Sequence, residues 1–228
     1  MAVLLVLMLC AYLGGNFYIY LRGLQAIQHC PPLVKGVFTG FFWFSVLSLI
    51  LIMTFRNAKL SSSAWAHFFF EYSTGWLVFT LYMSLLLLFF EGFRLFNHPF
   101  PYSFIVSLGL TICILSYGYY RYQHPATQVI NIDINKSASV SEVPFKIVAV
   151  SDIHLGMGTT QGQLQKYVRM IQAQQPDLIL ISGDLIDNSI VPVRSRQMEK
   201  ELAQLYAPSG IYMVPGNHEY ISGIANCA

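Results

Sequence analysis

Long uncharged stretches fill the first half of the chain. Four of them are long enough to cross a membrane, because a helix needs about 20 apolar residues to span a hydrocarbon core of about 30 Å. They are Met1–Leu21, Gly36–Phe55, Tyr72–Phe90 and Leu95–Tyr120. Two prolines in the last stretch place the expected start of its helix near Phe100. The pattern therefore predicts four transmembrane helices within residues 1–122.

The first stretch has a second interpretation, since an apolar amino-terminal segment can be a cleaved signal peptide. Met1–Leu21 lacks the basic start of such a peptide. Bulky residues between Tyr12 and Tyr20 do not suit a small-residue cleavage site. An uncleaved membrane helix is the favoured interpretation.

The second half of the chain has a different pattern. Residues 123–144 are interpreted as a linker, in which the alternation of Val129–Ile134 favours a strand and Lys136–Ser141 favours a loop. Residues 145–228 then alternate short apolar runs with amphipathic segments. The runs predict strands at Lys146–Val150, Leu178–Ile181 and Ile211–Val214, and the segments predict helices at Gln161–Gln174 and Arg194–Tyr206.

Strands that alternate with helices in this way indicate a parallel α/β sheet. Strands as short and apolar as these are typical of sheets that are buried on both faces. The expected fold class is an α-helical membrane region followed by a small α/β domain.

Composition agrees with this division. The chain is 55% hydrophobic and only 11% charged, whereas soluble domains are about 25% charged. A net charge of +2, with scattered basic residues, excludes a basic nucleic-acid-binding surface. No acidic or basic residue lies in the middle of a predicted span, where a pump or transporter would need one. The membrane region is therefore interpreted as an anchor.

Basic residues near the span ends indicate an orientation. Four spans place the amino end and the carboxyl-terminal region on one side, together with Arg56, Lys59, Arg121 and Lys136. The opposite side has Arg22, Lys35 and Arg94. Under the positive-inside rule, four against three favours a cytoplasmic second domain. We expect a multi-pass protein of the plasma membrane.

Polar residues with metal-binding chemistry follow each predicted strand. They are Asp152 and His154 after the first strand, Gly183, Asp184 and Asp187 after the second, and Gly216, Asn217, His218 and Glu219 after the third. Each group alone is weak evidence, because similar residues form ordinary turns and helix caps. Ligands of open α/β sheets gather outside the carboxyl ends of the strands, so the joint occurrence predicts one metal site.

The donor types suit two divalent ions. Carboxylate, imidazole and amide oxygen together favour Mn, Fe or Zn. Asp152 and His154 are two residues apart and project the same way from an extended segment, so both can hold one ion. Asp184 has two oxygens and can bridge to a second ion, to which Asn217 offers a neutral oxygen. Two ions about 3.5–4 Å apart clamp a phosphate and lower the pKa of a bridging water.

The three motifs Asp152-x-His154, Gly183-Asp184-x-x-Asp187 and Gly216-Asn217-His218-Glu219 resemble the first three blocks of the calcineurin-like metallophosphoesterase superfamily. An apolar region before them is similar to the membrane-anchored branch of that superfamily. The resemblance implies a β-sandwich flanked by helices, with a dinuclear centre that hydrolyses phosphomonoesters or phosphodiesters.

The resemblance also implies roles for individual residues. Asp152 and His154 would bind the first metal, Asp184 would bridge, and Asn217 would bind the second metal. His218 would be catalytic, contacting the scissile phosphate or protonating the leaving group. Asp187 and Glu219 would orient the ligands.

Later family blocks, which contain a further histidine and a Gly-His-x-His segment, have no counterpart after Glu219. We therefore expect residues 145–228 to be the amino-terminal part of an incomplete, truncated metallophosphoesterase domain. Two hypotheses follow. One is a membrane-anchored phosphoesterase, whose substrate contains a phosphoester or pyrophosphate bond and is lipid-linked. The other is a non-catalytic membrane protein whose degenerate domain binds a partner or a metal.

Overall fold

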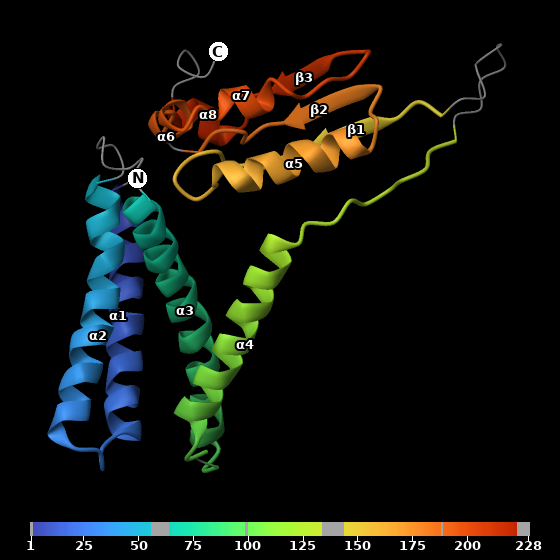
Figure 1. Ribbon diagram of the computed structural model, residues 1–228. Coiled ribbons are helices and arrows are strands. Elements are labelled where there is room, and N and C mark those ends of the chain that lie inside the picture. The colour runs from blue at the N-terminus through green and yellow to red at the C-terminus, as the bar shows by residue number, and fades with distance from the viewer. Residues whose placement is uncertain (1, 56–63, 99, 134–143, 188, 223–228) are drawn as a thin grey trace. The chain divides into compact units, whose positions relative to one another are not determined.

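The computed structural model of the chain describes residues 2–55, 64–98, 100–133, 144–187 and 189–222. The chain divides into two compact units. One consists of Met1–Thr54 and Phe68–Pro125, and the other of Phe55–His67 and Ala126–Ala228. Long helices build the first unit, and a small sheet with its covering helices builds the second (Figure 1).

Four helices of the membrane region are long and apolar enough to cross a bilayer. They are α1 (Ala2–Ala26), α2 (Pro32–Phe55), α3 (Ala64–Leu95) and α4 (Ser103–Gln123), which confirms the four spans expected from the sequence. The helices continue beyond the charges that bound the uncharged stretches, so that Arg22, Lys35 and Glu91 are helical. Long charged side chains near a helix end can extend to water while the backbone stays hydrogen-bonded.

Interhelical hydrogen bonds and aromatic packing hold the first unit together. Tyr12 donates from its hydroxyl to the Val46 carbonyl at 3.0 Å, joining α1 to α2, which lie side by side in Figure 1. Asn16 is fully buried and its Oδ1 accepts from Trp76 Nε1 and Thr80 Oγ1, both at 3.1 Å. Polar side chains of this kind join helices in an apolar medium.

The second unit is built on three parallel strands in the order β1-β2-β3. They are β1 (Ile147–Val150), β2 (Leu178–Ser182) and β3 (Ile211–Val214), which confirms the predicted strands and their parallel arrangement. Of the β-sandwich that the family resemblance implies, the described residues contain this one sheet.

Helix α5 (Gln161–Ala173) covers one face of the sheet (Figure 1). Thr160 caps it by accepting from the Gln163 amide at 3.2 Å. Leu164, Val168 and Ile171 recur at helical spacing and pack in one buried cluster with Ile179 and Ile181 of β2. This core carries the strands and so places the loops that follow them.

The prediction of a single helix over Arg194–Tyr206 is wrong. The segment forms two short helices, α6 (Val191–Ser195) and α7 (Glu199–Leu202). Between them Gln197 has a φ of +52°, in the left-handed region that interrupts a right-handed helix. Met198 still enters the core, and Leu202 and Leu205 pack against it, which explains why the apolar spacing resembled one helix.

Burial of both sheet faces is also not observed among the described residues. Tyr212 and Val214 of β3 are 62% and 61% exposed and alternate with Ile211 and Met213, whose register partners Ile179 and Ile181 lie in the core. The helices α5, α6 and α7 contribute to the core on that one face.

The strand expected at Val129–Ile134 is absent from residues 129–133, the part of it that the structure describes. Ile130 and Ile132 are 73% and 78% exposed there. Alternation alone is insufficient for a strand, because its backbone groups need a neighbouring strand to pair with. The predicted loop at Lys136–Ser141 lies outside the described residues.

Candidate metal centre

The loops after β1 and β2 continue the parallel pairing of the two strands. His154 donates its amide to the Asp184 carbonyl at 3.0 Å, and Leu155 donates to the Leu185 carbonyl at 2.7 Å. Asp187 then donates back to the Leu155 carbonyl at 2.9 Å. Backbone hydrogen bonds therefore hold the polar segments of the two loops against each other in a defined register.

Unusual backbone conformations mark the same loops. Asp152, His154 and Asp184 have φ values of +55°, +49° and +51°. Residues with side chains rarely adopt this region, at a cost of about 1–3 kcal/mol each, and such residues cluster at functional sites. The concentration of three of them beside one sheet edge supports a functional assignment for this edge.

Two glycines allow the loops after β2 and β3 to approach closely. A Cβ atom on Gly183 would lie 2.8 Å from the backbone nitrogen of Gly216, and one on Gly216 would lie 2.7 Å from the Asp184 nitrogen. Distances this short exclude a side chain at either position. The glycines therefore allow the Gly216–Glu219 motif to lie against the Gly183–Asp187 motif.

One group of possible ligands consists of Asp152, His154 and Asp184. Each offers a donor atom within 4.8 Å of the others, and His154 Nε2 lies 3.7 Å from Asp152 Oδ1. The set matches the residues that the sequence predicts for the first metal and the bridge. Two carboxylates and an imidazole fit a borderline divalent cation.

A second group consists of His154, Asp187 and His218, again with donor atoms within 4.8 Å. His218 Nδ1 lies 3.0 Å from Asp187 Oδ1, and the two imidazole rings are 4.5 Å apart, edge to face. The family resemblance implies that Asp187 orients the ligands, and it lies beside the His218 imidazole. Its membership of a ligand group is a feature that sequence reasoning missed.

Glu219 lies in the first turn of α8 (Asn217–Ser222) and joins the loops that follow β2 and β3. The residue is 1% exposed, and its carboxylate accepts from the amides of Asp184, Ile186 and Gly216 at 2.8–2.9 Å. Burial disfavours the charged form, but these backbone donors outweigh it and hold the pKa of Glu219 below its usual range. The arrangement agrees with the expected orienting role.

The remaining expected ligand, Asn217, is the first residue of α8 and is exposed. Its neighbour His218 donates its backbone amide to Asp184 Oδ1 at 2.9 Å. That bond connects the third motif directly to the carboxylate expected to bridge.

Arg196 supports the site from outside the three motifs. Its Nη1 donates to the carbonyls of Gly156 and Thr159, at 3.2 and 3.3 Å, and so holds the loop that follows His154. Burial lowers the pKa of this guanidinium from its ordinary value. Nothing in the local sequence around Arg196 indicates the contact, because its partners are about forty residues away.

The site combines features needed for phosphate chemistry. Carboxylates and imidazoles fit divalent ions, and His218 is placed beside them with one ring nitrogen directed to a carboxylate. That contact occupies Nδ1 of His218, so Nε2 is the ring nitrogen that remains for another ligand.

Comparison with known proteins agrees with the geometry. Residues 145–226 match the family model described as calcineurin-like phosphoesterase. No solved structure matches the chain significantly. The matched region contains all seven of the expected site residues.

Several relatives match parts of the chain, and three of them bear on the site and the membrane region. A zebrafish (Danio rerio) "Transmembrane protein with metallophosphoesterase domain" is 31% identical over 51% of the chain and 26% of its own length. An "Uncharacterized metallophosphoesterase" of Campylobacter jejuni is 26% identical over 92% of the chain and 57% of its own length. The "UDP-2,3-diacylglucosamine pyrophosphatase LpxG" of Chlamydia trachomatis is 32% identical over 36% of the chain and 24% of its own length.

The chain thus spans between about a quarter and three fifths of the length of these relatives. The similarity to the Campylobacter protein includes the membrane helices as well as the metal-site motifs. The motifs, their geometry and the family match agree: residues 145–226 match the calcineurin-like phosphoesterase family, and the chain is similar to transmembrane proteins that contain a metallophosphoesterase domain.

Proposed function

We propose that the protein is a membrane-anchored, metal-dependent phosphoesterase that hydrolyses phosphomonoester, phosphodiester or pyrophosphate bonds. The observation that carries the proposal is the convergence of Asp152, His154 and Asp184, with donor atoms within 4.8 Å, beside His218. A two-ion site of this kind supplies Lewis-acid polarisation of a phosphoryl oxygen and a water of lowered pKa.

Each residue then has a defined task. Asp152 and His154 hold the first ion, Asp184 bridges, and Asn217 holds the second. Asp187 accepts from His218 Nδ1 at 3.0 Å, which fixes the ring and directs Nε2 to the substrate. From that atom His218 contacts the scissile phosphate or gives a proton to the leaving group.

The proposed substrate is lipid-linked. Two observations support this choice: the four membrane helices, which keep the domain near a bilayer, and the relative whose name describes a pyrophosphatase of a diacylated sugar nucleotide. We also propose that the second unit faces the cytoplasm and that the membrane is the plasma membrane.

The test is hydrolysis of bis-p-nitrophenyl phosphate by the purified full-length protein in detergent, with and without Mn²⁺. Asp184→Asn removes the proposed bridge, and Asp133→Asn is the matched control because Asp133 is exposed in the linker. We expect Asp184→Asn to lower bound metal and to reduce turnover at least 100-fold, with the control unchanged.

Full metal content and full rate in Asp184→Asn would contradict the bridging assignment. A folded, metal-loaded protein without activity on any phosphoester would instead favour a non-catalytic, metal-binding domain. The substrate class is tested separately by comparing UDP-2,3-diacylglucosamine with soluble nucleotides. Hydrolysis of the nucleotides alone would refute the lipid-linked substrate and leave the phosphoesterase assignment intact.

A further inference from the structure

A cavity of about 510 Å³ lies in the membrane unit. It lies where α1 and α3 end and α4 begins, at the end of the bundle drawn at the bottom of Figure 1. Its polar lining residues are Arg22, Gln25, Glu91, Arg94 and Ser103. The presence of three charged side chains in a cavity of a membrane bundle requires an explanation, because unpaired charge is costly beside lipid.

The charged side chains form ion pairs within the cavity, but two positive groups share one negative group. Arg22 Nη1 lies 2.9 Å from Glu91 Oε1, and its Nη2 donates to Ser103 Oγ at 2.8 Å. Arg94 meets Glu91 Oε2 at 3.6 Å. Two guanidinium groups against one carboxylate leave an excess charge of +1 among the described lining residues.

The two arginines differ in exposure. The side chains of Arg22 and Glu91 are 21% and 27% exposed, so their pair belongs to the wall of the cavity. Arg94 is 68% exposed and only loosely paired, so most of its five N–H donors remain available to a ligand. Guanidinium donors bind phosphate oxygens in a planar, bidentate geometry.

The first turn of α4 adds to the positive potential. Ser103 begins this helix and lines the cavity, and Tyr102 before it makes no side-chain cap. The Ser103 amide donates to the Phe100 carbonyl at 3.2 Å, and the amide groups of the turn as a whole carry partial positive charge, which favours an anion nearby.

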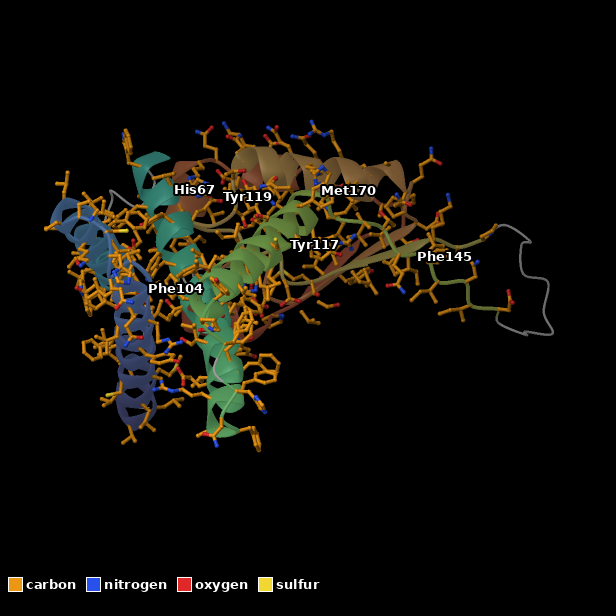
Figure 2. All side chains as sticks on the ribbon, turned by 90° about the horizontal axis from the view of Figure 1, so that it is seen from below. His67, Phe104, Tyr117, Tyr119, Phe145 and Met170 are labelled. Carbon is orange, nitrogen blue, oxygen red and sulfur yellow. The ribbon has the colours of Figure 1, made fainter. Side chains whose placement is uncertain are left out.

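The rest of the lining is apolar and mostly aromatic, and this favours a lipid over a free anion. Phe90, Phe100 and Phe104 line the same cavity, and Phe104 is labelled in Figure 2. Helix ends of a four-span bundle lie at the bilayer surface, at the depth of the headgroups. A ligand there presents a phosphate to the arginines and its glycerol and acyl portion to the aromatic rings.

We propose that this cavity binds the phosphate headgroup of an anionic phospholipid. The site is separate from the proposed hydrolysis, because α4 crosses the membrane between Ser103 and the linker that follows Gln123. It lies at the bundle end opposite the one from which that linker leaves. The bound lipid therefore acts as a structural or regulatory ligand and not as the substrate.

The experiment measures lipid retention by native mass spectrometry of the purified full-length protein in neutral detergent. The protein is titrated with dioleoylphosphatidylglycerol, with dioleoylphosphatidylcholine and with inorganic phosphate. We expect phosphatidylglycerol to bind at least tenfold more tightly than phosphatidylcholine, and inorganic phosphate not to displace it at millimolar concentration.

Three variants and a control identify the site. Arg94→Gln removes the exposed donor and should weaken phosphatidylglycerol binding about tenfold, while leaving the Arg22–Glu91 pair in place. Arg22→Gln should weaken it at least as much. Glu91→Gln keeps an oxygen acceptor, removes the negative charge and should tighten binding several-fold. Lys35→Gln removes a basic residue of α2 that does not line the cavity and should have no effect.

Unchanged binding in Arg94→Gln, with circular dichroism showing native helix content, would overturn the proposal. An equal loss in Lys35→Gln would also overturn it, since it would indicate attraction to surface charge in general. Retention of inorganic phosphate without any preference for phosphatidylglycerol would refute the lipid as the ligand. None of these outcomes depends on phosphoesterase activity.

Discussion

Glu219 joins the loops that form the candidate metal centre. Its carboxylate satisfies three backbone amides that belong to the loops after β2 and β3. Without an acceptor the buried amide of Ile186 and the partly buried amides of Asp184 and Gly216 would lose their partner, at about 1–3 kcal/mol for a fully buried group. The side chain therefore stabilises the fold and also fixes the backbone of Asp184.

Replacement of Glu219 by Ala is expected to lower the free energy of unfolding by about 3 kcal/mol or more, because three amides lose their acceptor. Bound Mn²⁺ should fall in parallel, since the loop of Asp184 is released. Thermal unfolding in detergent and metal analysis of the same preparation check both effects. Glu199→Ala, at an exposed glutamate of α7, serves as the control. A variant with native stability would show that water replaces the carboxylate.

Helices α5 and α7 are joined by a second carboxylate. Glu201 accepts from Gln165 at 2.8 Å, from Gln161 at 3.2 Å and from Gln204 at 2.8 Å. The hydrogen bond from Gln165 contributes most, and together these donors hold the pKa of Glu201 below its usual range despite its partial burial.

A depressed pKa makes this contact dependent on pH. The stabilisation is fully present above the pKa of the unfolded chain, about 4.3 for Glu, and is lost as the pH falls through the lower folded-state value. The melting temperature should therefore fall between about pH 5 and pH 3, and more steeply than in Glu201→Gln. Melting curves of both proteins across that range provide the test. Identical slopes would contradict the assignment.

Asn16 joins helices α1 and α3 inside the membrane unit through Trp76 and Thr80. Asn16→Ala removes both bonds and should destabilise the bundle by about 1–2 kcal/mol, since interhelical hydrogen bonds in membranes are worth about 0.6 kcal/mol on average and up to about 1.7. Thermal inactivation in detergent measures the loss. Cys113→Ala, at an exposed position of α4, is the control, and equal losses in both variants would refute a specific contribution of Asn16.

Four membrane-spanning helices would fix which segments of the chain lie on the same side of the membrane. Cys30 lies between α1 and α2, and Ser195 lies in the second unit, so the three helices α2, α3 and α4 separate them. A membrane-impermeant maleimide should therefore label Cys30 and a Ser195→Cys variant from opposite sides of the membrane. The other native cysteines are replaced by alanine in both proteins. Labelling of both positions from one side would refute the four-span arrangement.

The proposed orientation is tested by the same labelling. Under the positive-inside rule the second unit faces the cytoplasm, so Ser195→Cys should react only after permeabilisation of whole cells. Reaction of that variant in intact cells would reverse the orientation and would leave the number of spans unchanged.

The sequence by itself determined the division into membrane and α/β regions, the four spans, the three strands and the position of each metal-site motif after its strand. These features depend on local patterns of apolar residues, whose burial is the main driving force of folding. The family resemblance rests on the same local motifs. The motifs pointed to Asp152, His154 and Asp184 as candidate ligands, but the extended segment expected at Asp152 and His154 is wrong, because both residues have positive φ values in the structure.

Only the tertiary structure decided how distant segments meet. Gln197 breaks an apparently continuous helix so that residues on both sides of it can reach one core. Glu219 finds donors 33 and 35 residues away, and Arg22 of α1 pairs with Glu91 of α3 to form the wall of a cavity. Contacts of this kind depend on the folded path of the chain, and spacing along the sequence does not encode them.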